Sequence, residues 1–469
     1  MGRYSRLGKN TILVFIGNLG SKLISLILLP FYTRWLSVAD YGLTDIFNVY
    51  VSLIIGIVSC CIGESLFIFP KGTDETQKKQ YFSTGVLFLF GTMFLTAVAF
   101  TICDLVGKQY IIRNSFFDNC WLVYGMTGCM LAQQTIQQFT RSLGKMLVYS
   151  VTGIVVTATT ALFSFIFIPK YGVYGYVVAM NFAYLCGATY SLVFSGAYHY
   201  FNLHCFSIEK CREMLKYSIP LIPNGIMWWL VGALNRPVME AAVGLEGIGL
   251  FAVANKFPSI LTMVFSVFCV SWQISILEEY GKEGFHTFYN KIFRMIFFCL
   301  FLLFVIVVIF CRDLVVLLTT QDYYDAWKYV PLLLLGALLS AMSGMGGTVF
   351  SAVKQSKYFF YSSVWGAITA MVANMLLIPS YGVWGAALSV VLSFFTMAVS
   401  RIGYAWKYVK VKQLEKYIFM LVGAAISAGS VLEENITFFY TINAVFIVLL
   451  ICVNWDLKAY LTKLKQHIK

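Results

Sequence analysis

The chain carries Ile168-Pro169-Lys170-Tyr171-Gly172-Val173-Tyr174-Gly175, and the same pattern returns as Ile378-Pro379-Ser380-Tyr381-Gly382-Val383-Trp384-Gly385. Each copy lies between two apolar segments and predicts a tight turn between two helices. The proline ends the first helix because its ring removes a helical hydrogen bond. The glycines permit the turn and a close helix contact after it. The two copies therefore indicate an internal repeat.

The surroundings of the two octapeptides repeat as well. A short basic loop precedes each copy by one apolar segment, at residues 141–145 and 354–357. A weaker echo pairs Tyr41-Gly42-Leu43 with Ile248-Gly249-Leu250 at nearly the same offset of about six segments. Six is an even number, so both halves have the same orientation, as in a parallel repeat about an axis along the membrane normal.

The composition excludes a water-soluble globule. Hydrophobic residues make up 59% of the chain and charged residues 12%, with a mean hydropathy of +0.78, whereas soluble domains carry roughly 25% charged residues. Apolar runs of membrane-spanning length, about 20 residues, occur at residues 11–32, 43–69, 82–103, 121–139, 146–168, 173–197, 219–240, 248–276, 292–311, 329–350, 358–378, 383–405, 417–432 and 438–453. The sequence predicts an all-α membrane protein of about fourteen transmembrane helices, whose first span is not a cleaved signal.

The repeat divides these spans into two parallel six-helix lobes plus two C-terminal helices. We expect an N-terminal lobe over residues 1–198, a cytoplasmic linker over 199–216 and a C-terminal lobe over 217–412. Residues 413–469 then supply two extra helices and a basic tail.

The basic residues predict the orientation. With the N-terminus in the cytoplasm, about 25 of the 34 lysines and arginines fall in cytoplasmic segments and about six in outer loops. Both termini are therefore expected in the cytoplasm. The net charge of +13 is scattered over many short loops, so the chain is not expected to bind nucleic acid.

No motif for chemistry is found. The twelve cysteines mostly lie inside apolar runs without metal-ligand spacing, so we expect no disulfides and no metal site. The sequence has no phosphate-binding glycine loop, no paired nucleophile and base, and no zinc motif. We expect no enzyme activity and no cofactor, and any transport would be driven by an ion gradient, the membrane potential or substrate flux.

We single out three cations within the apolar spans. Lys22 is in the middle of the first span, Arg236 in the outer part of the seventh, and Lys256 in the outer third of the eighth. A charge at the bilayer centre costs about 2.5–3.5 kcal/mol. Lys22 shares a helical face with Asn18 and Ser25, so we expect a wet cavity between the halves. Three cations there favour an anionic ligand, phosphate especially.

A structural explanation of these cations stays open. Glu240 follows Arg236 by one helical turn and could pair with it. Asp45 and Glu64 on the second span are further candidate partners.

Amide and aromatic side chains add candidates for substrate binding. Gln134 and Gln138 share one face of the fourth span, and amides suit sugar hydroxyls because they both donate and accept hydrogen bonds. Hydrogen bonding between helices is the alternative. The seventh span opens with Pro220 and Pro223, followed by Asn224 and Trp228. The prolines predict a kink, and Trp228 could stack on a sugar ring or simply pack.

With these landmarks the sequence resembles bacterial polysaccharide flippases of the multidrug/oligosaccharidyl-lipid/polysaccharide exporter (MOP) superfamily, over nearly the whole chain. The resemblance rests on Pro30-Phe31-Tyr32-Thr33-Arg34-Trp35-Leu36 with Tyr41-Gly42, on Ser218-Ile219-Pro220-Leu221-Ile222-Pro223, and on the two Tyr-Gly-Val-aromatic-Gly turns. Family members often carry an Asp-Arg pair in the seventh span, where this chain has Asn235-Arg236.

The resemblance implies a V-shaped, two-lobed fold of fourteen helices in the bacterial inner membrane. It implies that an undecaprenyl-pyrophosphate-linked oligosaccharide crosses to the outer leaflet for O-antigen, capsule or exopolysaccharide synthesis, beside a polysaccharide polymerase machinery. Lys22, Arg236 and Lys256 would hold the pyrophosphate, with Gln134 and Gln138 near the glycan. A proton or sodium ion would be coupled through the carboxylates of Asp45, Glu64 or Glu240.

Three other functions compete with the flippase. A cation-coupled multidrug exporter of the same fold would favour carboxylates over cations in its cavity. A glycan polymerase or ligase would need a large external loop, whereas the longest one here covers about residues 104–120. A scaffold without a substrate would not need cations inside the bilayer.

Overall fold

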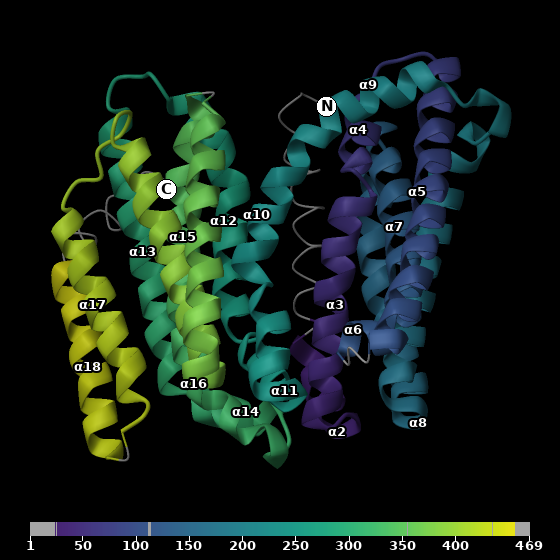
Figure 1. Cartoon of the computed structure of the whole chain (residues 1–469). Coiled ribbons are helices and arrows are strands. Elements are labelled where there is room, and N and C mark those ends of the chain that lie inside the picture. The colour runs from purple at the N-terminus through teal and green to yellow at the C-terminus, as the bar shows by residue number, and fades with distance from the viewer. Residues whose placement is uncertain (1–23, 25, 111–113, 354, 434, 455–469) are drawn as a thin grey trace. The chain divides into compact units, whose positions relative to one another are not determined.

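The computed structural model describes residue 24 and residues 26–110, 114–353, 355–433 and 435–454. These residues form helices joined by turns, and none of them is in a strand (Figure 1). The predicted all-α fold is therefore confirmed. Asn18 and Lys22, together with most of the first predicted span, lie outside the described residues.

The chain forms two compact units. Unit 1 comprises Met1–Trp229 and Gly244–Gly249, and unit 2 comprises Leu230–Val243 and Leu250–Lys469. The chain thus passes from one unit to the other within two helices, α10 and α11, which follow the predicted linker. The predicted limits of the lobes, the linker and the C-terminal appendage stay predictions.

The helices from α2 to η3 lie in unit 1, and α10 passes into unit 2 at Leu230. Their bounds are α2 Leu29–Trp35, α3 Val38–Val58, α4 Ile62–Ile68, α5 Glu75–Tyr110, α6 Ser115–Asp118, α7 Cys120–Ser142, α8 Met146–Ser195, η1 Ala197–Tyr200, η2 Leu203–Cys205, α9 Ile208–Ser218, η3 Ile219–Leu221 and α10 Ile222–Gly232.

The remaining helices lie in unit 2, except for residues 244–249 of α11. Their bounds are α11 Asn235–Ala254, α12 Pro258–Glu279, α13 Phe285–Ile309, α14 Cys311–Leu318, η4 Gln321–Lys328, α15 Val330–Ala352, α16 Lys357–Ala405, α17 Leu414–Ser430 and α18 Ile436–Val453. Helix α15 is the most deeply buried of the candidate spans, and it packs mainly against α16 and α12.

The repeated octapeptides form the same turn in both units. Gly172 in α8 has φ 54° and ψ −127°, and Gly382 in α16 has φ 57° and ψ −129°. A Cβ atom on Gly175 would lie 2.2 Å from the Phe167 carbonyl oxygen, and one on Gly385 would lie 2.1 Å from that of Leu377. The predicted turns are confirmed, and each of the long helices α8 and α16 consists of two segments joined by a sharp bend.

The second and seventh predicted spans are each divided into shorter helices. The second predicted span, 43–69, divides into α3 and α4 because Cys60 and Cys61 have positive φ angles of 46° and 53°. The seventh, 219–240, divides into the short helix η3, α10 and the start of α11. Pro220 lies in η3 and Pro223 in the first turn of α10, where the missing N–H is tolerated.

Eight helices in the described part of the chain are long and apolar enough to cross a membrane. Among them, α8 with 50 residues and α16 with 49 residues each have more than twice the length of one span. Together with the shorter apolar helices, this is an all-α membrane protein of about fourteen helices.

Candidate functional site

Arg236 is held inside unit 2 near the start of α11. One terminal nitrogen, Nη1, donates to the Gly232 carbonyl oxygen at 2.8 Å and to the Asn235 side-chain oxygen at 2.9 Å. The guanidinium carbon lies 4.8 Å from the centre of the Phe251 ring, and the residue is 6% exposed. These contacts fix the orientation of the cation. Its role as an anion ligand stays a prediction.

Helix α11 is kinked at Gly244 (φ 69°, ψ −172°), and Glu240 and Lys256 lie on either side of this kink. Glu240 is half-buried on α11, one turn after Arg236. Lys256 is half-buried in the turn between α11 and α12, where its carbonyl oxygen accepts from the backbone N–H and hydroxyl of Ser259. The eighth predicted span, 248–276, is therefore interrupted at Lys256. Pro258 then begins α12 at a position that needs no N–H donor.

The four glutamines of α7 divide into two pairs. Gln133 donates from Nε2 to Oε1 of Gln137 at 2.8 Å, and Gln137 donates to the Tyr149 carbonyl oxygen at 2.9 Å. This pair links α7 to α8. Gln134 and Gln138 lie on another face of α7 and are half-buried.

Gln138 and Glu64 lie on neighbouring helices of unit 1. A Cβ atom on Gly63 would be 3.7 Å from Cγ of Gln138, so α4 packs against α7 at this point. Oε1 of Gln138 is buried and has no hydrogen-bond partner among the described residues. Glu64, next to Gly63, is exposed. An amide oxygen that can still accept a hydrogen bond therefore lies at the contact between α4 and α7.

Asp45 is half-buried on α3, one turn after the buried Tyr41. One turn further along α3, Asn48 donates to the Tyr176 hydroxyl at 2.8 Å. The Tyr32 hydroxyl lies 2.9 Å from Oγ of Ser164. The sequence does not predict these two hydrogen bonds, because each joins residues more than 100 positions apart on different helices.

Helix α10 presents exposed polar and aromatic side chains. Asn224 and Trp228 are both exposed. Trp229, by contrast, donates from Nε1 to the Val49 carbonyl oxygen at 3.1 Å and so ties α10 to α3. Of these two adjacent tryptophans, Trp229 has a structural hydrogen bond, whereas the Trp228 ring is exposed.

Arg401 is a buried cation that the sequence analysis missed. It lies near the end of the predicted span 383–405, where a basic residue is typical of a loop, but the structure places it inside α16 with 2% exposure. Nε donates to Oγ of Ser362 at 3.0 Å, and the terminal nitrogens donate to Oγ of Ser363 and the Ser343 carbonyl oxygen, both at 3.4 Å. The pair Gly346-Gly347 on α15, which makes room for this side chain, was the available signal.

The described residues contain no group of three or more His, Cys, Asp or Glu side chains that could hold a metal ion. The residues predicted for the site are instead cations, amides, carboxyls and a tryptophan within apolar stretches of the sequence. This chemistry suits the binding of a polar ligand within a membrane. The fold is that of an all-α multi-pass membrane protein.

Comparison with solved structures identifies the fold as that of the MOP superfamily. The lipid II flippase MurJ in an inward closed conformation matches with a TM-score of 0.68 and 15% identity, over 96% of this chain and 100% of that chain. A MOP superfamily transporter from Pyrococcus furiosus matches with a TM-score of 0.58 and 14% identity, over 86% and 95%. At these identities the likeness shows the shared fold.

Sequence comparison then identifies the family. The polysaccharide biosynthesis protein family matches residues 7–272, which is more than half of the chain, so the chain belongs to this family. An uncharacterized membrane protein of Methanocaldococcus jannaschii is 22% identical over 343 residues, which cover 65% of this chain and 76% of that protein. The predicted resemblance to polysaccharide flippases of the MOP superfamily is confirmed at the level of family and fold.

Proposed function

We propose that the chain is a flippase that moves an undecaprenyl-pyrophosphate-linked oligosaccharide across the bacterial inner membrane by alternating access around a cationic central cavity. Both termini lie in the cytoplasm in this proposal. The transported glycan lipid supplies the synthesis of a surface polysaccharide, and the polymerase that extends it is the expected partner.

The position of the family match supports this proposal most directly. Residues 7–272 include every residue predicted to bind the substrate, from Asn18 to Lys256. They also include the three carboxyl groups proposed for ion coupling, on Asp45, Glu64 and Glu240. The features on which the proposal depends therefore lie in the part of the chain that defines the family.

The chemistry of the side chains assigns the roles. Lys22, Arg236 and Lys256 supply positive charge for the pyrophosphate, whose oxygens accept charge-assisted hydrogen bonds. Gln134, Gln138, Asn18 and Asn224 supply amides for sugar hydroxyls, and Trp228 supplies a ring face for a sugar. These residues would bind the substrate. A proton or sodium ion bound to a carboxyl group would supply the driving force.

Lys22→Ala tests the anion site. We expect the variant to reach the membrane in normal amount but to abolish surface glycan, whereas Lys22→Arg, which keeps the charge, retains a measurable amount. Surface glycan is measured by immunoblotting, and lipid-linked oligosaccharide is extracted and quantified. Normal glycan in Lys22→Ala would exclude this lysine from the substrate site.

Arg236 needs a separate design because it also has structural contacts. Arg236→Ala removes the donor to the Gly232 carbonyl oxygen and to Asn235, so its thermal stability is measured beside its activity. Arg236→Lys keeps the charge. If the charge binds the pyrophosphate, Arg236→Lys transports more than Arg236→Ala at matched folded amounts. Equal transport by the two variants would contradict the proposed role.

A multidrug exporter is the second candidate, because transporters of this kind share the fold. The inward-facing conformation of a MATE family transporter matches with a TM-score of 0.61 and 14% identity. A strain that lacks the chain separates the two functions. Accumulated lipid-linked oligosaccharide on the inner leaflet supports the flippase, whereas unchanged oligosaccharide with increased sensitivity to cationic drugs supports the exporter.

A further inference from the structure

Arg141 lies in the last turn of α7, beside two aromatic rings. Its guanidinium carbon is 3.8 Å from the centre of the Phe67 ring on α4 and 5.7 Å from the centre of the Tyr149 ring on α8. Stacking of this kind uses the face of the guanidinium and leaves the N–H groups at its edge available. Among the described residues, none accepts a hydrogen bond from these groups, and Glu64 of α4 forms no ion pair with them. The half-buried cation can therefore donate to a ligand.

Gln138 lies one helical turn before Arg141 on the same face of α7. Its Oε1 atom is buried and accepts no hydrogen bond from the described part of the chain. Gly63 of α4 packs against this side chain, and Phe67, the ring under Arg141, follows Gly63 by one turn. Helix α4 thus runs along α7 past both polar side chains. A buried amide oxygen of this kind needs a donor, which a ligand with a hydroxyl group can supply.

Two contacts with α8 hold this part of α7 in place. Gln137 donates from Nε2 to the Tyr149 carbonyl oxygen at 2.9 Å, and the Thr140 hydroxyl lies 2.8 Å from Oγ of Ser191. These contacts use neither the Gln138 oxygen nor the Arg141 N–H groups. The fold therefore fixes the helix that carries both groups and leaves their hydrogen-bonding capacity to a ligand.

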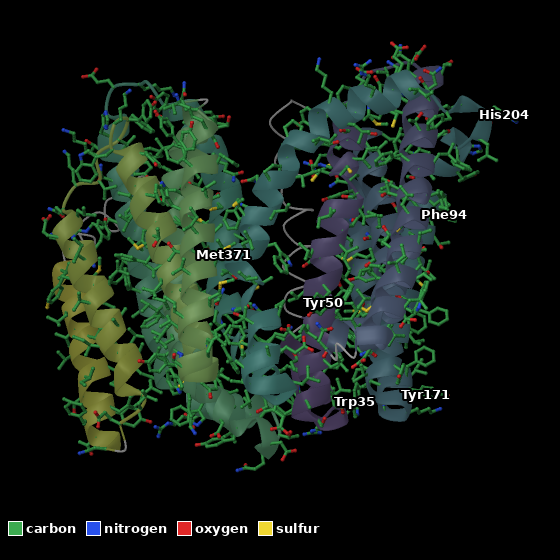
Figure 2. The ribbon with its side chains drawn as sticks, in the orientation of Figure 1. Trp35, Tyr50, Phe94, Tyr171, His204 and Met371 are labelled. Carbon is green, nitrogen blue, oxygen red and sulfur yellow. The ribbon has the colours of Figure 1, made fainter. Side chains whose placement is uncertain are left out.

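This end of α7 lies beside the linker that the sequence predicts to be cytoplasmic. The Phe139 ring centre is 5.4 Å from that of Tyr200 in η1. Figure 2 shows His204 of the linker at this end of unit 1 and Tyr171 at the opposite end. In the proposed orientation, Gln138 and Arg141 therefore lie at the cytoplasmic leaflet, where a substrate that moves outward binds first.

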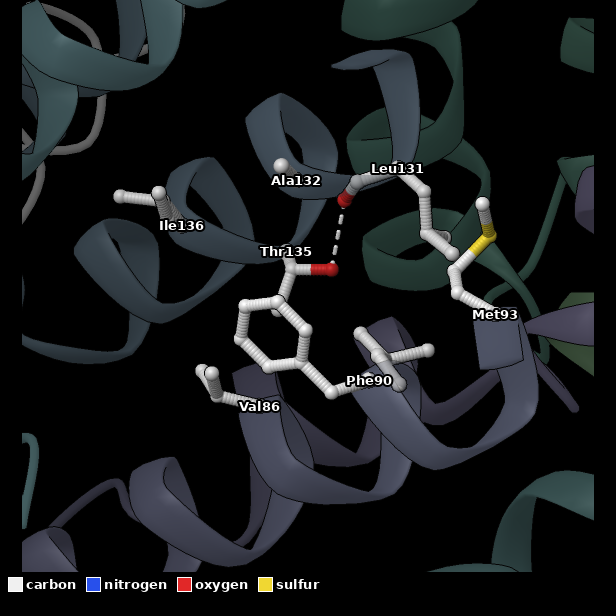
Figure 3. A pocket seen from close by; sticks show the side chains of 8 residues that line it. Val86, Phe90, Met93, Leu131, Ala132, Thr135 and Ile136 are labelled. Atoms are coloured by element: carbon white, nitrogen blue, oxygen red, sulfur yellow. Dashed lines mark hydrogen bonds between the residues drawn. The ribbon is translucent and has the colours of Figure 1, made fainter. Parts of the chain in front are cut away.

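An apolar groove between α5 and α7 lies on another face of α7. Its volume is about 170 Å³, and it is lined by Val86, Leu89, Phe90, Met93, Leu131, Ala132, Thr135 and Ile136 (Figure 3). The Thr135 hydroxyl already donates to the Leu131 carbonyl oxygen at 2.7 Å, so the groove offers a ligand only apolar surface. Gln134, Gln138 and Arg141, at positions i, i+4 and i+7, form a polar stripe separate from this groove.

We propose that Arg141 and Gln138 bind the phosphate and the first sugar of a glycosyl pyrophosphate headgroup. The guanidinium edge donates to phosphate oxygens, and Oε1 of Gln138 accepts from a sugar hydroxyl. The two residues are about 4.5 Å apart along the helix axis, and a sugar carries its phosphate and its hydroxyls on one ring. A carrier lipid without a sugar offers no hydroxyl to Gln138. The site rests on the proposed flippase function and selects the glycosylated carrier over the bare one.

Equilibrium binding to the purified full chain tests the site separately from transport. The labelled protein in detergent is titrated, by microscale thermophoresis, with an undecaprenyl-pyrophosphate-linked oligosaccharide, with undecaprenyl pyrophosphate and with phosphatidylglycerol. We expect Arg141→Gln to bind both pyrophosphate lipids about tenfold more weakly, and Arg141→Lys, which keeps the charge, to lose less. Arg212→Gln, at an exposed arginine of α9, is the matched control and should bind as the wild type does.

Gln138→Leu tests the sugar contact and leaves the ring contacts of Arg141 intact, so it decides the question if Arg141→Gln does not fold. We expect about fivefold weaker binding of the oligosaccharide lipid and unchanged binding of undecaprenyl pyrophosphate. Unchanged binding of the oligosaccharide lipid, or an equal loss for the carrier without sugar, would overturn the proposal. So would an equal loss of phosphatidylglycerol binding in Gln138→Leu, because the site would then recognise a phospholipid headgroup.

Failure of the site and failure of the proposed function give different results. A wild type that binds the oligosaccharide lipid no better than Arg141→Gln and Gln138→Leu would overturn the site alone. A wild type that binds neither pyrophosphate lipid would contradict the proposed function as well.

Discussion

At the scale of single residues, the buried cations Arg236 and Arg401 show how the chain accommodates charge within apolar helices. Each guanidinium donates to carbonyl or side-chain oxygens and lies near an aromatic ring, Phe251 for Arg236 and Phe359 for Arg401. Such contacts offset the cost of removing a charge from water. Internal cations therefore have structural as well as functional uses in this protein.

Arg401→Ala should destabilise the protein by about 3 kcal/mol, because it removes the donor to Ser362, Ser363 and the Ser343 carbonyl oxygen and leaves a cavity. Lys407→Ala, at an exposed cation shortly after α16, is the matched control. Thermal unfolding in detergent, followed by intrinsic fluorescence, measures the difference. A variant as stable as Lys407→Ala would show that the contacts of Arg401 are not structurally important.

The sequence revealed charges inside apolar runs but not their partners. The position of Arg236 was evident from the hydropathy pattern, since a cation stood out in an apolar segment. Arg401 lies near the end of such a segment, where a charge is typical of a loop. Its burial depends on Ser343, which is 58 residues earlier and belongs to another helix. A pattern within one helix does not contain that information.

At the scale of helices, glycines allow close backbone contacts at positions related by the repeat. Gly42 in α3 and Gly249 in α11, which form the weaker echo, lie against each other within unit 1. A Cβ atom on Gly42 would be 2.1 Å from the Leu245 carbonyl oxygen and 2.8 Å from the Gly249 nitrogen. On Gly249 it would be 2.0 Å from the Val38 carbonyl oxygen. The echo thus corresponds to a helix crossing that larger residues would disrupt.

Gly42→Ala should separate these helices and cost about 3 kcal/mol, at the upper end for overpacking, because the obstructing atoms belong to the backbone. Gly56→Ala on the same helix has nothing within 4 Å of the added atom and should stabilise α3 by up to about 1 kcal/mol. The two variants are compared by thermal unfolding. Equal stability would contradict the close crossing.

Gly172→Ala and Gly382→Ala test whether the repeated turns are equivalent. Both glycines combine a positive φ with ψ near −130°, a conformation that costs other residues about 1–3 kcal/mol. We expect both variants to lose stability, whereas Gly153→Ala in a regular part of α8, with open space around it, loses none. Stability losses at Gly172 and Gly382 no greater than at Gly153 would contradict the predicted role of these turns.

The sequence predicts where helices lie better than it predicts where they are interrupted. The turns at Gly172 and Gly382 carry glycine and proline, so the sequence predicts them. The break between α3 and α4 falls at Cys60 and Cys61, which continue the apolar run and give no turn signal. Hydropathy detects membrane burial but not the backbone conformation of an apolar residue.

At the scale of the whole molecule, the membrane explains why the architecture follows from sequence. Backbone groups in hydrocarbon must be satisfied within each segment, so long apolar runs become helices. The family match over residues 7–272 and the shared fold of MOP transporters agree with that expectation. The polar residues of the predicted site depend on contacts between distant segments, and their roles therefore rest on the proposed function.

Translocation by the purified full chain tests the central claim most directly. The chain is reconstituted into vesicles that contain a fluorescent undecaprenyl-pyrophosphate-linked oligosaccharide, and a membrane-impermeant glycosidase reports the glycan on the outer surface. We predict that the wild type exposes the inner pool to the enzyme and that the double variant Lys22→Ala, Lys256→Ala does not. An inner pool that stays protected with wild-type protein, or equal exposure by the double variant, would contradict a cation-dependent flippase.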